Sequence, residues 1–339
     1  EGATLSYKNN SEWETEGTLT KTGGTMSWVS VVWSLEGGTT YSSDTPIKTE
    51  TLSLNNYLLT LASAGSDLTV TDNLTFDDSN EKIITGGADL TLQGGLTLGG
   101  GLLSSTGGTV SLEKGGVLSG GSFDVTDSTL KLGDNFTKTS GTLTMLQTTL
   151  KLEDNSTLTS NEKLNFENLN LNDFTLILDN STSDLQVQNA ITINSSGEGI
   201  STGEADLILL STLTMSNGLL ESTGGTWKLN GDFNKTSGTL SITETDLTLT
   251  NNITLTSDQD RSLNFETLNL NLYTLTLGSS TSDLTVQNAI TIDASTEGIS
   301  TGEADLISLA PLNISNGGVA STGGIVSLSV GGQLSGTGE

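Results

Sequence analysis

The chain repeats itself over long distances, and this repetition restricts its possible folds more than any other feature. The segment Ser183–Leu207 recurs at Ser282–Leu306, 99 residues later, and a weaker copy at Ser66–Leu90 lies 117 residues before the middle one. Repetition of this kind is typical of arrays in which each repeat packs against its neighbours. The sequence therefore predicts one continuous array, with long repeats at residues 1–108, 109–225 and 226–324 and the start of a fourth at 325–339.

The array begins and ends inside a repeat, and the chain has no initiator Met and no signal peptide. We interpret it as a window from a longer repetitive protein, whose targeting segments would lie elsewhere.

A shorter pattern runs inside the long repeats. Triplets in which two apolar residues flank a polar one recur every 19 to 21 residues within two series, at residues 90–171 and 227–270. This alternation predicts half-buried strands, and the Gly, Asn, Asp and Ser residues between them predict turns. The middle repeat holds about 20 extra residues near Val110–Thr129, which equals one period of the pattern. The triplets are Leu90–Leu92, Val110–Leu112, Leu130–Leu132, Leu150–Leu152, Leu169–Leu171, Trp227–Leu229, Leu247–Leu249 and Leu268–Leu270.

This pattern predicts an all-β fold, a parallel β-solenoid with about 20 residues per coil and about 17 coils. Leu, Ile, Val and Phe would point inward, and Thr, Ser, Asn and Asp would point outward. A helical repeat is disfavoured because a period of about 3.6 residues is almost absent. An array of β-sandwiches is the main alternative, since the long repeats match such domains in length. A sandwich, however, would not accommodate an extra 20-residue period in register.

The composition excludes several classes of function. Without Cys or His, the chain has no disulfides, no thiolate or imidazole metal site and no His-dependent catalysis. Its net charge of -28, from 40 acidic and 12 basic residues, disfavours nucleic-acid binding because phosphates would be repelled. No apolar run approaches the roughly 18 residues of a transmembrane helix. The 33% hydrophobic content fits alternation around a thin core.

Glycine-rich and Thr-Leu segments such as Gly94–Leu112 and Gly238–Leu249 resemble bacterial β-helix surface proteins. The similar families are autotransporter passenger domains and filamentous-haemagglutinin-type adhesins. The resemblance covers essentially the whole chain and implies a right-handed parallel β-helix, secreted to the cell surface, that serves as a stalk or adhesin. It maps no functional residue onto this sequence.

The candidate catalytic residues are two repeated acidic pairs, Glu204-x-Asp206 and Glu303-x-Asp305, each just before a predicted strand. Enzymes that cleave polysaccharides on this fold place carboxylates in a groove along the rod, and a catalytic pair needs a fixed separation and a shifted pKa. A motif that recurs in copy after copy favours a turn that each coil needs. We therefore predict no catalytic residue, and we interpret Arg261 as part of a solvated loop.

The acidic composition also makes calcium binding a function to consider. Ca²⁺ requires six to eight oxygen ligands from several groups, and no known calcium-loop motif is present. Asp77-Asp78 and Asp258-x-Asp260 are local candidates only. We predict no cofactor and no defined metal site, apart from diffuse, weak calcium binding to the acidic surface. The alternative interpretation is that the surface charge binds no specific ligand. It would keep the protein soluble and prevent the sides of the solenoid from pairing with other chains.

The four tryptophans are Trp13, Trp28, Trp33 and Trp227, and aromatic rings can bind sugars. Trp13, Trp28 and Trp227 align with apolar residues of other copies, which predicts core positions. Trp33 lies in the apolar segment Trp28–Leu35, and if it were exposed it would be the best candidate for a contact surface.

The sequence thus predicts a non-enzymatic extracellular protein, a rigid stalk or fibre segment of a bacterial cell-surface adhesin. Its expected partners are cell-surface or matrix components, including glycans. One alternative is a self-assembling filament subunit that associates end to end, because solenoid ends without a polar cap expose unpaired strands. A second is a glycan- or calcium-dependent binding module. The least favoured is a polysaccharide-degrading enzyme, which would need a groove with clustered carboxylates in one copy only.

Overall fold

The computed structural model describes residues 5–6, 11–22, 26–27, 31–258 and 263–335. All regular elements in these residues are β-strands. They form a β-solenoid of about 16 turns with roughly 20 residues per turn, which confirms the predicted fold class with one turn fewer than expected. The chain divides into two compact units, unit 1 at Glu1–Asn161 and unit 2 at Glu162–Glu339.

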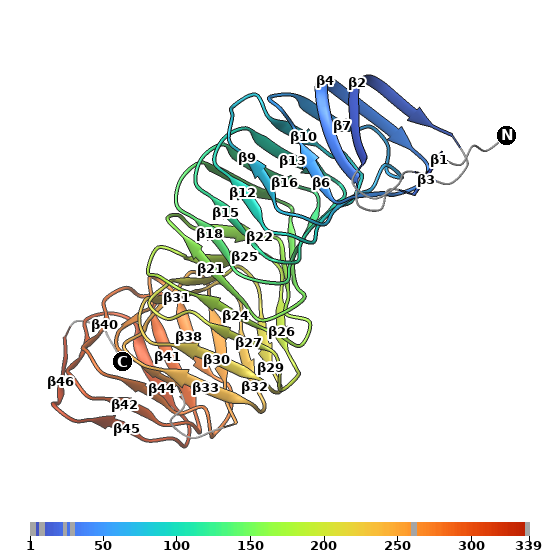
Figure 1. The fold of residues 1–339 in the computed structure, drawn as a ribbon. Coiled ribbons are helices and arrows are strands. Elements are labelled where there is room, and N and C mark those ends of the chain that lie inside the picture. Colours follow the sequence, from blue (N-terminus) through green and yellow to red (C-terminus); the bar gives the residue numbers. More distant parts are fainter. Residues whose placement is uncertain (1–4, 7–10, 23–25, 28–30, 259–262, 336–339) are drawn as a thin grey trace. The chain divides into compact units, whose positions relative to one another are not determined.

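Unit 1 consists of parallel sheets in which strands from successive turns lie side by side (Figure 1). Its first sheet contains β2 (Ser11–Lys21), β4 (Val31–Ser43), β6 (Thr51–Ser53), β7 (Leu58–Leu61), β10 (Lys82–Ile84), β13 (Leu102–Thr106), β16 (Ser122–Thr126) and β19 (Thr142–Leu146). Its second contains β5 (Ile47–Thr49), β8 (Leu68–Val70), β11 (Leu90–Leu92), β14 (Thr109–Leu112), β17 (Thr129–Leu132) and β20 (Thr149–Leu152). Its third contains β9 (Leu74–Phe76), β12 (Leu96–Leu98), β15 (Gly116–Leu118), β18 (Phe136–Lys138) and β21 (Ser156–Ser160). A short pair, β1 (Leu5–Ser6) and β3 (Met26–Ser27), completes the unit.

Unit 2 is built in the same way. One sheet contains β22 (Leu164–Phe166), β25 (Leu185–Val187), β28 (Leu207–Leu209), β31 (Thr226–Leu229), β34 (Asp246–Leu249) and β37 (Leu268–Asn269). Another contains β26 (Ile191–Ile193), β29 (Leu213–Met215), β32 (Phe233–Lys235), β35 (Ile253–Thr256), β38 (Thr274–Leu277), β41 (Gly298–Gly302) and β44 (Gly318–Ser321). The remaining strands are β23 (Asn168–Asn170), β24 (Thr175–Leu178), β27 (Gly199–Ser201), β30 (Leu219–Ser222), β33 (Thr239–Ile242), β36 (Leu263–Phe265), β39 (Leu284–Val286), β40 (Ile290–Ile292), β42 (Leu306–Ser308), β43 (Leu312–Ile314), β45 (Val326–Leu328) and β46 (Gly332–Leu334).

The core of each unit is a set of apolar ladders. In unit 1, Leu90, Val110, Leu130 and Leu150 stand directly above one another on four neighbouring strands, and each is at most 2% exposed. The alternating side chains between them face outward because successive residues of a strand point to opposite sides. Complete burial of each such side chain contributes roughly 1.5–3 kcal/mol. The apolar triplets of the sequence are therefore the source of both the fold and its stability.

The extra 20-residue period of the middle repeat forms one turn of the solenoid. Thr109–Leu112 pairs in register with Thr129–Leu132, and Gly116–Leu118 pairs with Phe136–Lys138. The insertion thus adds a complete coil and leaves the inward and outward faces of its neighbours unchanged.

Sharp turns recur at the same place in each long repeat. Two consecutive residues with positive φ occur at Asn55–Asn56 (49° and 68°), Asn172–Asp173 (52° and 70°) and Asn271–Leu272 (49° and 74°). Asn and Asp tolerate this left-handed conformation better than other residues with a Cβ. Leu272 does not share that tolerance, so this turn of unit 2 is strained.

Candidate functional site

Trp33 does not provide the contact surface that the sequence left open. It is 0% exposed, because the alternation Val31-x-Trp33-x-Leu35 places all three side chains inward. Its ring stacks on Trp13 with centroids 6.2 Å apart, and its Nε1 donates a hydrogen bond of 2.8 Å to Thr15 Oγ1. The exposure that a contact surface at Trp33 would require is therefore not present. Trp227 is also in the core, at 1% exposure, and Trp28 lies outside the described residues.

The repeated Glu-x-Asp pairs are built as turn contacts. Asp206 Oδ1 accepts a hydrogen bond of 2.8 Å from the backbone N–H of Thr226 in the next coil. Asp305 Oδ1 accepts the equivalent bond from Ile325, also at 2.8 Å. The glutamates of these pairs, Glu204 and Glu303, are exposed. The same coil-to-coil contact is made by Asp67 to Asp89, Asp89 to Thr109, Asp184 to Asp206 and Asp283 to Asp305. The recurrence supports the structural interpretation of these carboxylates.

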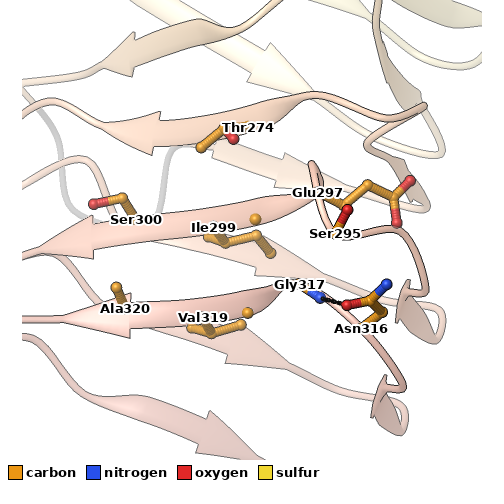
Figure 2. Close-up of a pocket in the computed structure, with 11 residues that line it drawn as sticks. Thr274, Ser295, Glu297, Ile299, Ser300, Asn316, Gly317, Val319 and Ala320 are labelled. Atoms are coloured by element: carbon orange, nitrogen blue, oxygen red, sulfur yellow. Dashed lines mark hydrogen bonds between the residues drawn. The ribbon is translucent and has the colours of Figure 1, made fainter. Parts of the chain in front are cut away.

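A second repeated carboxylate borders a hollow in unit 2. The hollow, of about 450 Å³, is lined by outward-facing parts of β38, β41 and β44 and by the turns before them. Figure 2 shows Glu297 and Asn316 at the turn end of these strands, away from Ser300 and Ala320. Glu297 Oε2 accepts backbone hydrogen bonds from Asp293 (2.9 Å) and Ala294 (3.3 Å). Its Oε1 accepts one of 3.1 Å from Leu272.

These contacts determine the charge state of Glu297. Burial alone would raise the pKa of this carboxyl, but the hydrogen bonds from the backbone N–H groups of Asp293, Leu272 and Ala294 outweigh it, so the pKa lies below its ordinary value of 4.5. Glu81 and Glu198 accept similar backbone bonds in the other copies. An ionised carboxylate held by its own turn is a poor general acid, and Glu297 is the single carboxylate among the residues that line this hollow.

Three lysines point into the solenoid. Lys21 donates to Asp44 Oδ1 at 3.1 Å, Lys138 to Asn161 Oδ1 at 2.7 Å, and Lys235 to Asp258. In each case the acceptor lies 23 residues further along the chain. Lys138 and Lys235 are only 2% and 1% exposed. The lysines that begin the repeated segments Lys21–Thr25, Lys138–Thr142 and Lys235–Thr239 therefore supply another coil-to-coil contact, which was not predicted from the sequence.

Unit 1 contains a polar groove on its outer surface. Its volume is about 530 Å³, and it lies on the outward side of β11, β14, β17 and β20. Hydroxyl side chains are contributed by Thr91, Thr109 and Ser111, and Gly133 leaves space between its neighbours. Charged side chains are contributed by Asp89, Glu113, Lys114, Lys131, Glu153 and Asp154. The sequence analysis did not assign any of these residues to a site.

Some of the charges in this groove are already paired. Glu153 Oε1 lies 2.9 Å from Lys151 Nζ and 3.8 Å from Lys131 Nζ. One oxygen of Asp89 accepts the backbone N–H of Thr109 at 2.7 Å. Among the described residues, Lys114 makes no ion pair, and the contact nearest to Glu113 Oε1 is Gln93 Nε2 at 3.5 Å. The groove therefore offers free polar groups of both signs.

Two of the calcium candidates, Asp78 and Asp258, are engaged by other side chains. Asp78 Oδ1 accepts two hydrogen bonds from Asn80 within its own turn, and Asp258 is paired with Lys235. Asp260 and Arg261 lie outside the described residues. In the part of the chain that the structure describes, no three acidic side chains are grouped so as to hold a metal ion.

The described residues include no helix long and apolar enough to cross a membrane. Comparison of the chain with protein-family models, with curated proteins and with solved structures gave no match. The fold and the contacts above therefore define the protein as a β-solenoid repeat protein, and its role must be argued from them.

Proposed function

We propose that the chain is a non-enzymatic structural segment of an extracellular protein, a rigid stalk or fibre segment at a bacterial cell surface. The observation that carries this proposal is the use of the repeated polar side chains. The aspartates that precede strands, the turn glutamates and the inward lysines all make hydrogen bonds between or within coils. These groups hold the coils together, which is what a stiff spacer requires.

The energetics support a mechanical role. A single hydrogen bond of this kind contributes about 0.5–1.5 kcal/mol, and the same contact recurs from coil to coil. In a repeat array the total stability is approximately the sum of coil terms and neighbour terms. Coils can therefore be added without loss of stability. The extracellular and bacterial placement rests on the resemblance of segments such as Gly94–Leu112 to β-helix surface proteins.

Negative-stain electron microscopy combined with limited proteolysis tests this proposal. We expect single elongated particles of uniform width and prolonged resistance to a broad-specificity protease under native conditions. Round or two-lobed particles, or rapid cleavage within the described strands, would contradict it. Particles that lengthen with protein concentration would instead favour the filament alternative.

A further inference from the structure

The polar groove of unit 1 carries an inference beyond a structural role. We propose that it binds an uncharged, hydroxyl-rich saccharide, so that this part of the chain is a glycan-binding site. The groove is the set of residues described above on β11, β14, β17, β20 and their turns. The proposal rests on the groove alone and does not depend on the chain being a stalk.

The extra coil separates one carboxylate of this groove from a lysine. In unit 2, Asp206 and Lys228 lie on adjacent coils, and Lys228 Nζ is 2.5 Å from Asp206 Oδ2. In unit 1 the corresponding carboxylate is Asp89, and the inserted coil stands between it and Lys131. The inserted coil presents Ser111 where Lys228 stands in unit 2. The short serine leaves open the space that the lysine side chain fills in unit 2.

The separation of these partners also frees their hydrogen-bonding capacity. Asp89 Oδ2 makes no hydrogen bond or ion pair with a described residue, since only Oδ1 is used by Thr109. Lys114 and the hydroxyl groups of Thr91 and Ser111 are likewise available within the described part of the chain. The groove thus has acceptors on the Asp89 and Glu113 side and ammonium donors at Lys114 and Lys131.

A sugar hydroxyl suits this arrangement because it can donate to a carboxylate and accept from an ammonium or a threonine at the same time. The volume of about 530 Å³ lies in the range of roughly 300–1,000 Å³ found for small-molecule sites. Anionic glycans are disfavoured because the lining has four carboxylates against two lysines and the whole chain carries a charge of -28. The ligand is therefore expected to be neutral.

The groove contains no aromatic ring, so hydrogen bonds must provide most of the binding free energy. Each of them competes with hydrogen bonds to water, so its net contribution is small. We expect a dissociation constant in the millimolar range for a single disaccharide, which corresponds to about -4 kcal/mol. Binding of this strength becomes useful when many copies of the protein face many copies of the glycan.

The test uses the complete chain and a panel of neutral disaccharides of glucose, galactose, mannose and N-acetylglucosamine, with sialylated and sulfated sugars alongside. Binding is followed by saturation-transfer NMR and by titration. We expect at least one neutral disaccharide to bind saturably and the anionic sugars to bind more weakly. No saturable binding of any neutral sugar at millimolar concentration, or binding of the anionic sugars alone, would overturn the proposal.

Two variants locate the binding on the groove. Ser111→Lys reproduces the residue that unit 2 has at this position, and it should fill the groove, pair with Asp89 and weaken binding at least tenfold. Thr91→Ile reproduces Ile208 of unit 2 and should weaken binding by removing a hydroxyl. Both residues occur naturally at equivalent outward positions, so both variants are expected to fold, which thermal unfolding will check.

The matched control is Thr192→Lys, which adds a lysine at an exposed outward position of β26 in unit 2 and should leave sugar binding unchanged. Unchanged binding in both unit 1 variants, or equal loss in the unit 2 control, would show that the sugar binds elsewhere and would contradict the proposal. Electron microscopy and proteolysis of the same variants would remain normal, so failure of this inference is distinguishable from failure of the stalk proposal.

Discussion

The two units contain copies of one repeat, but each has a buried tryptophan whose indole N–H is bonded differently. Trp33 in unit 1 and Trp227 in unit 2 are both inward-facing and at most 1% exposed. Trp33 Nε1 donates to Thr15 Oγ1, whereas Trp227 Nε1 has no hydrogen-bond partner among the described residues. Trp227 is held instead by edge contacts with Phe233 and Phe265, at centroid distances of 5.8 and 5.6 Å.

The strained turn at Leu272 and the groove beside the extra coil are further differences between the copies. Each affects a polar partner or a turn, while the apolar ladders are kept. The repeat therefore strictly requires inward apolar residues in register. It tolerates local losses of about 1 kcal/mol, because the neighbouring coils supply the remaining stability.

The largest expected effect comes from breaking the register. Deletion of residues 109–128 removes one complete coil, and we expect the shortened chain to fold with a similar unfolding transition. Deletion of residues 109–118 removes half a coil and would place strands against turns, so unit 1 should lose most of its stability, on the order of 5 kcal/mol or more.

Circular dichroism during thermal unfolding measures both deletions. Equal stability of the two variants would contradict the register argument. The complete-coil deletion also brings Asp89 next to Lys131, as Asp206 and Lys228 are in unit 2, and should therefore remove sugar binding as well.

The next largest effect separates the two tryptophans. Phenylalanine at either position loses ring volume, which costs roughly 1–3 kcal/mol. Trp33→Phe also removes the hydrogen bond to Thr15, whereas Trp227→Phe removes a buried N–H that has no partner. We expect Trp33→Phe to be more destabilising by about 1 kcal/mol. Chemical denaturation of the two variants checks this difference, and a larger loss at Trp227 would refute it.

Substitutions at the two turns should change the free energy of unfolding in opposite directions. Leu272→Asn should stabilise unit 2 by about 1 kcal/mol, because asparagine tolerates the positive φ better than leucine does. Asn56→Leu should destabilise unit 1 by a similar amount, since Asn56 has a φ of 68°. Denaturant midpoints of the two variants measure the changes. Shifts in the same direction for both would mean that φ is not the controlling factor.

The smallest expected effect concerns acidity. Because the hydrogen bonds lower the pKa of Glu297 in the folded state, the folded protein binds this proton less readily than the unfolded chain does. The carboxylate therefore contributes stability that is fully present above pH 4.5, the ordinary value, and is lost as the pH falls through the folded value. Glu297→Gln should flatten the pH dependence of the unfolding midpoint below pH 4.5. Parallel curves for the variant and the wild type would exclude this contribution.

The fold could be predicted because its main determinant is a pattern in the sequence. Triplets such as Leu130–Leu132, spaced by about one coil, specify which residues face inward, and turn residues mark the corners. The extra period near Val110–Thr129 was also correctly interpreted as one coil. These features are local or strictly periodic, so no knowledge of pairing is needed to find them.

The groove was not predictable in the same way. Asp89 and Asp206 occupy equivalent places in the repeat, but only the coil stacking shows that Lys228 reaches one of them and that no lysine reaches the other. The spacing holds a signal, since an acidic residue and a lysine 22 residues apart can pair on adjacent coils. Trp33 was left undecided because it ends a run of three consecutive apolar residues, Val31–Trp33, in which alternation does not distinguish the two faces.

The contacts between aspartates and backbone N–H groups of neighbouring coils run in one direction along the chain. In each, the carboxylate belongs to the earlier coil, and the backbone N–H that it accepts belongs to the later one, as for Asp67 to Asp89 and Asp89 to Thr109. A finished coil therefore presents acceptors in position before its successor has formed, and it serves as a template for growth toward the C-terminus. We expect such a chain to fold progressively as it emerges from a ribosome or a secretion pore. A chain truncated after Asn161 tests this expectation. Pulsed hydrogen exchange during its refolding should show protected amides in unit 1 although unit 2 is absent.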